Sequence, residues 1–248
     1  MLKKYIQPFL KNNKCFIVAY DQGLSKPTTI FQHQSQNPLY IYNLAKSINA
    51  TGIVLNKGIA EIFFQNRWNK IPIIIKLDHK TPDNQTAIQT CSVEYAKSLS
   101  AKAIGQTIYF GSSLEKEQIK EFAKNCEQAH KLKMGCILWA YSVESDFTTC
   151  QNIEQIKNNI RVCLELGADL IKLPKINDLN FLKEIKSMSP NLPIALRGGE
   201  LLTKEEFTDY ITLGLQNDAN GFIIGRNIWQ QENATEFGQK LHKLIFSK

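Results

Sequence analysis

A single lysine stands within an apolar stretch of the chain, Leu166-Gly-Ala-Asp-Leu-Ile-Lys-Leu-Pro174. The part from Ala168 to Leu173 is predicted to form a buried strand. Burying an unpaired ammonium group is costly, so Lys172 is expected to lose its proton there. A neutral amine is the nucleophile that forms a Schiff base with a carbonyl substrate. Alternatively, the ammonium group reaches solvent at the strand end or pairs with a carboxylate such as Asp169. This stretch alone favours neither interpretation.

The Schiff-base interpretation requires a lysine with a lowered pKa. An unperturbed lysine, with a pKa of about 10.4, is neutral in only about 0.04% of molecules at pH 7. Burial near Lys76 or Arg197 would lower the pKa by roughly 3 units, which corresponds to about 4 kcal/mol. The iminium formed by Lys172 would then accept electrons during C–C cleavage. Tyr141 could shuttle protons, and Asp21 could hold a substrate hydroxyl or take part in the proton transfer.

Each of these residues also has a purely structural interpretation. Asp21 could simply start a turn, and Lys76 could pair with Asp78. Tyr141 could be a packed aromatic residue whose hydroxyl bonds to the backbone. Trp139 stands two residues before Tyr141, so the two side chains are expected on the same face of one strand.

Two glycine-containing turns, Arg197-Gly-Gly199 and Gly225-Arg-Asn227, each stand between a predicted strand and a predicted helix. Free backbone N–H groups at a helix start bind anions, and barrel enzymes often bind phosphate after strands seven and eight. Arg226 adds a fixed positive charge. Plain turns are the alternative, but a phosphate site is favoured. The predicted substrate-binding residues are Trp139, Lys76, Arg197, Gly198, Gly199, Gly225 and Arg226.

The elements that would position these residues repeat along the chain. Eight apolar runs begin near residues 15, 52, 71, 103, 136, 168, 192 and 220 and alternate with helical patterns. Continuous apolar runs are typical of strands in a parallel sheet, and starts roughly 30 residues apart match one βαβ unit. An open doubly wound sheet competes, but no G-x-G-x-x-G follows the first strand. We predict an α/β fold, a single (β/α)8 TIM barrel domain over residues 1–248 with its site at the carboxyl ends of the strands.

The helical patterns give approximate boundaries. A short leading helix is expected at 3–11, and a long turn at 78–86, in which His79 is interpreted as a polar loop residue. The remaining helices are expected near 38–50, 58–69, 86–100, 114–133, 152–166, 178–188 and 203–215, with a last helix from 225 to about 245.

Composition narrows the class of protein. Of 248 residues, 43% are hydrophobic and 21% charged, as in ordinary globular proteins. The net charge of +7 suits phosphorylated metabolites, and no dense Lys/Arg run indicates nucleic-acid binding. The six cysteines form no C-x-x-C pair, so we expect reduced thiols in a cytoplasmic protein. No apolar run has the length of a membrane span, and the N-terminus lacks a signal-peptide pattern, so no membrane partner is expected.

Metal and hydrolase chemistry are not indicated. The four histidines are scattered, and none pairs with another at metal-ligand spacing, so neither a zinc nor an iron site is expected. No G-x-S-x-G is present. The prediction is carbonyl chemistry without a metal or cofactor.

Several segments together resemble the archaeal-type class I fructose-bisphosphate aldolases, from about residue 14 to about 230. They are Ile17-Val-Ala-Tyr-Asp-Gln-Gly23, Leu55-Asn-Lys-Gly58, Gly105-Gln-Thr-Ile-Tyr-Phe-Gly-Ser112, Trp139-Ala-Tyr141, Glu165-Leu-Gly-Ala-Asp-Leu-Ile-Lys172, Gly198-Gly199 and Ile224-Gly-Arg-Asn-Ile228.

The resemblance implies a metal-independent lyase on a (β/α)8 barrel, usually a homo-oligomer. Its reaction would cleave fructose 1,6-bisphosphate reversibly into dihydroxyacetone phosphate and glyceraldehyde 3-phosphate, a step of glycolysis and gluconeogenesis. The Schiff-base lysine would be Lys172 and the proton-transfer tyrosine Tyr141, beside Trp139. The aspartate of the first strand would be Asp21. The phosphate-binding residues would be Gly198, Gly199, Gly225 and Arg226.

Two departures from the family pattern fall at the barrel mouth. Asp21-Gln22-Gly23 stands where Asp-His-Gly is usual, and Tyr141-Ser-Val-Glu144 where Tyr-Pro-Arg-Gly is usual. They concern substrate contacts more than the Schiff-base chemistry. Two related groups of enzymes share this overall sequence pattern, the 2-amino-3,7-dideoxy-heptulosonate synthases and the phospho-autoinducer-2 thiolase. A non-catalytic phosphosugar-binding barrel is a further alternative.

Overall fold

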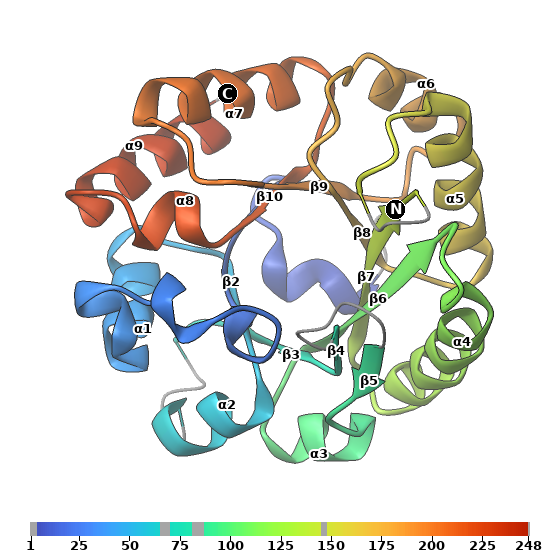
Figure 1. Cartoon of the computed structure of the whole chain (residues 1–248), viewed down its shortest axis with the longest axis horizontal. Helices are drawn as coiled ribbons and strands as arrows, with labels where there is room; N and C mark the ends of the chain where they lie inside the picture. The colour runs from blue at the N-terminus through green and yellow to red at the C-terminus, as the bar shows by residue number, and fades with distance from the viewer. Residues whose placement is uncertain (1–3, 65–69, 81–86, 145–147, 248) are drawn as a thin grey trace.

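The computed structural model describes residues 4–64, 70–80, 87–144 and 148–247. Eight parallel strands close into a barrel in the order β1-β10-β9-β8-β7-β6-β3-β2, and helices surround it (Figure 1). The predicted (β/α)8 barrel is therefore confirmed. The barrel strands are β1 (Cys15–Tyr20), β2 (Gly52–Leu55), β3 (Ile73–Lys76), β6 (Ala103–Phe110), β7 (Gly135–Ser142), β8 (Leu170–Leu173), β9 (Ile194–Arg197) and β10 (Gly221–Ile224).

Helices follow the strands and cover their outer faces. They are α1 (Pro38–Ser47), α2 (Lys57–Phe64), α3 (Val93–Ser98), α4 (Glu115–Lys131), α5 (Ile153–Glu165), α6 (Phe181–Met188), α7 (Lys204–Gln216), α8 (Arg226–Trp229) and α9 (Ala234–Phe246). The start of α7 is fixed by a reciprocal cap, in which the Thr203 hydroxyl accepts from the Glu206 N–H and the Glu206 carboxylate accepts from the Thr203 N–H. Among the described helices, none is both long and apolar enough to cross a membrane.

Alternation along the strands divides the buried side chains into two layers. In β7, Ile137 and Trp139 belong to the cluster inside the barrel, whereas Cys136 and Leu138 belong to the cluster between strands and helices. The same parity holds in β8, where Leu170 is in the inner cluster. Residues two apart share a face, so parity decides which side chains can reach the barrel interior.

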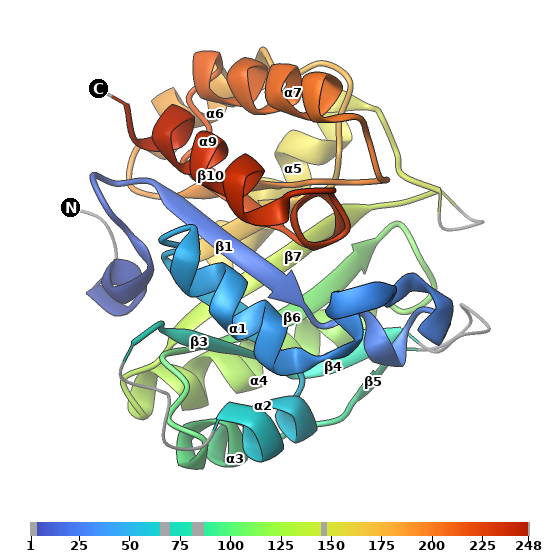
Figure 2. The same cartoon turned by 90° about the vertical axis from the view of Figure 1, so that its left-hand side faces the viewer.

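A short 3-10 helix, η1 (Lys4–Phe9), closes the amino-terminal end of the barrel. Ile6 and Phe9 are fully buried in the inner cluster. A side chain at Gly52, the first residue of β2, would place its Cβ 2.6 Å from the Phe9 ring. Figure 2 shows β1 running from the end where η1 lies toward the opposite end. Because η1 fills one end, the barrel interior opens toward the carboxyl ends of the strands.

The segment after β3 differs from the prediction. The expected long turn at 78–86 begins instead with a strand, β4 (Asp78–Lys80), which pairs antiparallel with β5 (Ala87–Gln89). The helix expected near 86–100 is present only as the shorter α3. Helix α3 begins at Val93 because the Ser92 hydroxyl accepts from the Tyr95 N–H. Residues 81–86, and the end of the helix expected at 58–69, lie outside the described residues.

Both ends of the chain also differ from the expected helices. The leading helix is a single 3-10 segment with Pro8 inside it, since proline removes a backbone donor. The last helix, expected to be continuous from 225, is interrupted after α8. Asn233 has a positive φ of 54°, which a right-handed helix does not accommodate, and α9 starts at the next residue.

Candidate active site

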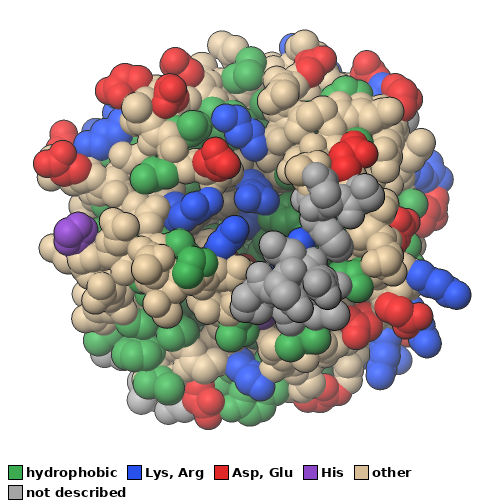
Figure 3. All heavy atoms as spheres, viewed as in Figure 1, with side chains coloured by type: hydrophobic (Ala, Val, Ile, Leu, Met, Phe, Trp, Pro, Cys, Tyr) green, Lys and Arg blue, Asp and Glu red, His purple; other side chains and the backbone are tan. Residues whose placement is uncertain are grey.

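A cavity of about 390 Å³ opens at the carboxyl ends of the strands. Lys and Arg side chains gather at the hollow in the centre of this face (Figure 3). Every residue predicted from the sequence to take part in the site lines this cavity. These are Asp21, Lys76, Trp139, Tyr141, Lys172, Arg197, Gly198, Gly199, Gly225 and Arg226.

Lys172 extends from β8 into this cavity, and only 5% of the residue is exposed. The pKa of its amine is lowered to about 7, chiefly by burial. Asp21 opposes the shift in pKa, and Arg197 and Lys76 contribute to it. Asp169 was considered from the sequence as an ion-pair partner of Lys172. It lies three residues before Lys172 and therefore faces the other side of the strand. Its carboxylate bonds instead to His130, with 2.8 Å between Oδ2 and Nε2.

Trp139 forms one wall beside this lysine. The Lys172 Nζ lies 4.8 Å from the centroid of the Trp139 ring, and the Lys76 Nζ lies 5.3 Å from it. The indole fits because the neighbouring strand has Gly105, where an added Cβ would lie 2.4 Å from two ring atoms. The glycine on β6 thus fixes the position of the aromatic wall on β7.

Tyr141 lies on the same face of β7, as predicted, and lines the cavity. Burial raises the pKa of its phenol to about 12, although a hydrogen bond and the positive charge from Arg197 oppose this. The Arg197 Cζ lies 5.3 Å from the ring centroid. At neutral pH Tyr141 is therefore a proton donor whose conjugate base would be stabilised by a guanidinium group.

Lys76 lines the cavity, but its three N–H groups point to protein acceptors. They are the Asp78 carboxylate, the Asp78 carbonyl at 2.8 Å and the Thr107 hydroxyl at 2.8 Å. The Thr107 N–H donates to both Asp78 carboxylate oxygens, at 3.1 and 3.0 Å. Burial raises the pKa of Asp78, and Lys76 opposes that shift. Lys76 thus acts on the site mainly through its charge. Its ion pair with Asp78, considered as an alternative from the sequence, is present.

The lining residues that were not among the predicted site residues include Thr107, Tyr109 and His79. The Tyr109 and Tyr141 rings meet edge to face, with 5.8 Å between centroids. His79 is buried on β4, and the positive charge of Lys76 adds to burial in lowering its pKa to about 4. This imidazole is neutral at physiological pH, and its Nε2 has no hydrogen-bond partner among the described residues. In the sequence, only the position of His79 next to Asp78 indicates that it lies near the barrel mouth, and that position predicts a loop residue.

Asn227 holds the turn after β9 in place. Its side-chain amide donates to the Gly198 carbonyl at 2.9 Å and to the Glu200 carbonyl at 2.6 Å, while its Oδ1 accepts from the Leu202 N–H. Arg226 donates to the Gly199 carbonyl at 3.1 Å. Gly199 has a φ of +73°, a conformation in which glycine is strongly preferred. The two glycine turns therefore form one connected wall.

Gly225 is needed for a close approach between β10 and the loop after β1. A Cβ there would lie 2.7 Å from the Gln22 Nε2 and 2.9 Å from the Ala19 carbonyl oxygen. Gln22, one of the two departures from the family pattern, also lines the cavity. Its buried Oε1 has no hydrogen-bond partner in the described part of the chain. This oxygen is therefore available to a ligand donor.

The cavity carries a strong positive charge at two sides. Six basic residues line it against two carboxylates, Asp21 and Asp78. Arg197 and Arg226 belong to the β9–β10 side, and Lys80 to the hairpin that follows β3. In the closed strand order, β3 stands directly across the barrel from β9. Burial and the charge of Lys26 lower the pKa of Lys80, so these two lysines lie near one another.

Comparison with known proteins agrees with this geometry. The model of the DeoC/LacD aldolase family matches residues 15–231. A class 1 fructose-bisphosphate aldolase from Thermoproteus tenax is 31% identical over 252 residues, which cover 99% of this chain and 95% of the relative. A 2-amino-3,7-dideoxy-D-threo-hept-6-ulosonate synthase from Archaeoglobus fulgidus is 24% identical, with 98% of this chain and 90% of the relative covered.

A solved structure shows the same architecture. It is an archaeal fructose-1,6-bisphosphate aldolase whose catalytic lysine is covalently bound to the carbinolamine intermediate of the substrate. The two chains are 30% identical and superpose with a TM-score of 0.90, and the match covers 98% of each.

Proposed function

Since the chain belongs to the DeoC/LacD aldolase family, we propose that it is a class I aldolase that cleaves fructose 1,6-bisphosphate reversibly. The products are dihydroxyacetone phosphate and glyceraldehyde 3-phosphate. The observation that carries this proposal is the Lys172 amine, buried in a basic cavity with its pKa lowered to about 7. About half of such amines are neutral at pH 7, compared with about 0.04% for an unperturbed lysine.

The reaction begins at the ketone carbon C2 of the open-chain sugar. The neutral Nζ of Lys172 attacks C2 and forms a carbinolamine, which loses water to give an iminium ion. Tyr141 is the residue best suited to protonate the departing hydroxyl, because its raised pKa keeps the phenol proton in place. The hydrogen bond from Arg197 then stabilises the phenolate until it recovers a proton.

The iminium makes the C3–C4 bond cleavable. A base removes the proton of the C4 hydroxyl, the C3–C4 electron pair moves toward the iminium nitrogen, and glyceraldehyde 3-phosphate leaves with an enamine remaining on Lys172. Protonation of C3 and hydrolysis by water release dihydroxyacetone phosphate and restore the amine. Asp21 lines the same cavity and is assigned to orient the substrate hydroxyls or to accept the C4 proton.

The two basic sides of the cavity suit a substrate with a phosphate at each end. We assign one phosphate to Gly198, Gly199, Gly225 and Arg226, and the other to Lys80 and Lys26 across the barrel. Lys76, at the end of β3, also lines the cavity, but its N–H groups are already bonded, so it contributes charge. Two lysines that repel one another are stabilised when a dianion binds between them.

A related synthase reaction is the second candidate. Gln22 and Val143, both at positions that depart from the family pattern, line the cavity, and a heptulosonate synthase is among the relatives. Ser142 points elsewhere, since its hydroxyl accepts from the Asn159 side chain at 2.7 Å. The altered contacts are thus limited to part of the mouth. A barrel that binds phosphosugars without turnover is the non-catalytic alternative.

A substrate panel separates these candidates. Cleavage of fructose 1,6-bisphosphate is measured by coupled assay of glyceraldehyde 3-phosphate, beside the synthase reaction and phospho-autoinducer-2 thiolysis. The proposal requires cleavage by the wild type and by Lys183→Met, which alters an exposed lysine of α6, and none by Lys172→Met. Preference for one of the other reactions, or ligand-induced stabilisation without turnover, would overturn it.

We also propose a cellular location and an oligomeric state. A cytoplasmic location is proposed from the cysteine pattern of the sequence, which contains no C-x-x-C pair. A homo-oligomer is proposed from the family resemblance, and light scattering of the purified protein tests it. A role in glycolysis or gluconeogenesis would follow from the cleavage reaction itself.

A further inference from the structure

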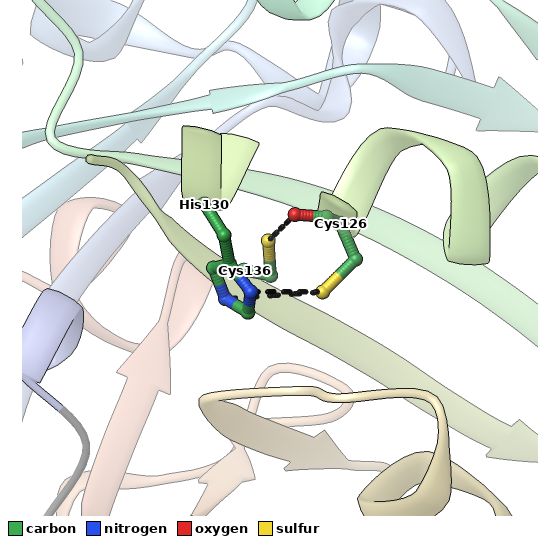
Figure 4. Close-up of side chains that lie close together, drawn as sticks. All are labelled: Cys126, His130 and Cys136. Carbon is green, nitrogen blue, oxygen red and sulfur yellow. Dashed lines mark hydrogen bonds between the residues drawn. The ribbon is translucent and has the colours of Figure 1, made fainter. Parts of the chain in front are cut away.

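Three side chains able to ligate a metal lie together outside the barrel interior. Cys126 and His130 come from the last turns of α4, and Cys136 from the start of β7 (Figure 4). Their ligand atoms all lie within 4.8 Å of one another. Cys136 faces the helix layer, whereas Trp139 on the same strand faces the active-site cavity. The cluster is therefore separate from the aldolase site.

The local structure explains how these residues meet. Cys126 and His130 are four residues apart and so share one face of α4. That face packs on β7, where Cys136 is fully buried. The Cys126 Sγ lies 4.0 Å from His130 Nδ1 and 3.9 Å from Nε2. The prediction of no metal site rests on the spacing between the histidines and on the lack of a C-x-x-C pair, and it leaves out the i, i+4 pair of Cys126 and His130.

A buried carboxylate orients the histidine. Asp169 is 1% exposed, and its Oδ2 accepts from His130 Nε2 at 2.8 Å and from the Cys136 N–H at 2.8 Å. A carboxylate can only accept here, so Nε2 carries a hydrogen and Nδ1 is the nitrogen that can bind a metal. Histidine ligands are commonly held in this way by a carboxylate on the other ring nitrogen.

The dimensions are close to those of a tetrahedral site. Bonds of about 2.3 Å to sulfur and about 2.0 Å to nitrogen place the ligand atoms roughly 3.5 to 3.8 Å apart. The observed separations, all within 4.8 Å, exceed these values by up to about 1 Å, so the side chains must rotate inward when an ion binds. The His130 side chain is 30% exposed, which leaves a route for an ion and for a solvent oxygen as the fourth ligand.

We propose that Cys126, His130 and Cys136 bind a zinc-class divalent ion that joins α4 to β7. Binding displaces the two thiol protons, and any proton on His130 Nδ1, to solvent. The ion and its two thiolates then carry no net charge between them, and the Asp169 carboxylate stays hydrogen-bonded to His130 Nε2. Two sulfurs and one imidazole favour Zn²⁺ over Mg²⁺ or Ca²⁺. The competing explanation is a network of weak thiol hydrogen bonds, since Cys126 donates to the Gly167 carbonyl at 3.5 Å and Cys136 to the Cys126 carbonyl at 3.6 Å.

Cobalt titration tests the proposal, because tetrahedral Co²⁺ bound to thiolates absorbs through sulfur-to-metal charge transfer. The full-length protein is treated with chelator under reducing conditions and titrated with Co²⁺, and then with Zn²⁺. One equivalent of Co²⁺ should produce the band, and one equivalent of Zn²⁺ should remove it. Zn²⁺ should also raise the melting temperature. A protein that shows no thiolate band after cobalt addition would refute the site.

Matched variants locate the ion. Cys126→Ser and Cys136→Ser should each lose the band and the stabilisation by Zn²⁺. Cys150→Ser should keep both, because Cys150 lies outside the cluster and its thiol already bonds to the Gln155 side chain. Asp169→Asn, which alters a positioning residue, should keep the band with affinity about 10- to 100-fold weaker. A band of undiminished strength in both cluster variants would mean that the metal binds elsewhere and would refute the assignment.

Discussion

The Lys172 Nζ lies 4.8 Å from the centroid of the Trp139 indole ring. A cation over an indole face is stabilised by about 0.5 to 2 kcal/mol, depending on how far it is removed from water. The indole therefore favours the charged forms at this nitrogen, which include both the ammonium group and the iminium ion of the proposed reaction. Burial acts in the opposite direction on the ammonium group.

Replacing the indole should slow the chemistry. Trp139→Leu removes the stabilisation of the iminium, so the rate of cleavage should fall about 2- to 30-fold, the range that corresponds to 0.5 to 2 kcal/mol. Trp139→Phe retains an aromatic face and should lose less. Single-turnover rates, compared with the free energy of unfolding of each variant, distinguish this effect from a packing defect. A Leu variant that is less stable yet equally fast would show that the ring is only a wall.

The rate of Schiff-base formation should rise with pH through about 7. Only the neutral amine attacks, so the rate should increase about tenfold per pH unit below the lowered pKa of Lys172 and level off above it. Asp21 raises that pKa, so Asp21→Asn should move the rise to lower pH even if turnover also falls. The measurement is the initial rate of trapping by borohydride across pH 5.5 to 9. A rise centred near the ordinary lysine pKa would contradict the account.

A single added carbon should displace the aromatic wall. In Gly105→Ala the new Cβ would lie 2.4 Å from the Trp139 ring, and overpacking of this kind costs about 1 to 3 kcal/mol. Denaturant unfolding should show that loss, together with a lower cleavage rate. Gly58→Ala on α2 is the control, because a Cβ there meets nothing within 4 Å and alanine favours the helix. Equal stability of the two variants would be inconsistent with the fit of Gly105 against Trp139.

The Lys76–Asp78 pair should show strong coupling. Lys76→Met leaves a buried carboxylate without its cation, which typically costs about 3 to 5 kcal/mol. Lys76→Met combined with Asp78→Asn removes both charges and should recover part of that loss. A double-mutant cycle of unfolding free energies measures the coupling. Additive losses would mean that the two side chains are energetically independent.

The barrel and the ten cavity residues named in advance could be predicted from the sequence because both depend on periodic features. Apolar runs at βαβ spacing located all eight barrel strands, and polar residues at their carboxyl ends must converge in a closed ring. The parity of β8 settles what the local sequence left open. Residues 170 and 172 face inward, so Asp169 faces α4 and bonds to His130 instead of Lys172.

What the sequence missed depends on long-range contacts or on single backbone conformations. His79 joins the cavity through the β4–β5 hairpin, which has no periodic signal. Tyr109 near the carboxyl end of β6 is different, because alternation from Thr107 would have indicated it. The break before α9 depends on the conformation of Asn233 alone. The cysteine–histidine cluster joins residues from a helix and a strand that no motif spacing connects.

The most direct measurement is trapping with borohydride in the presence of dihydroxyacetone phosphate, followed by mass mapping of the modified peptide. We predict a single reduced adduct on Lys172, within residues 166–175, that is absent from Lys172→Met and unaffected by Lys183→Met. An adduct on another lysine, or trapping that persists without Lys172, would contradict the assignment of this amine as the nucleophile.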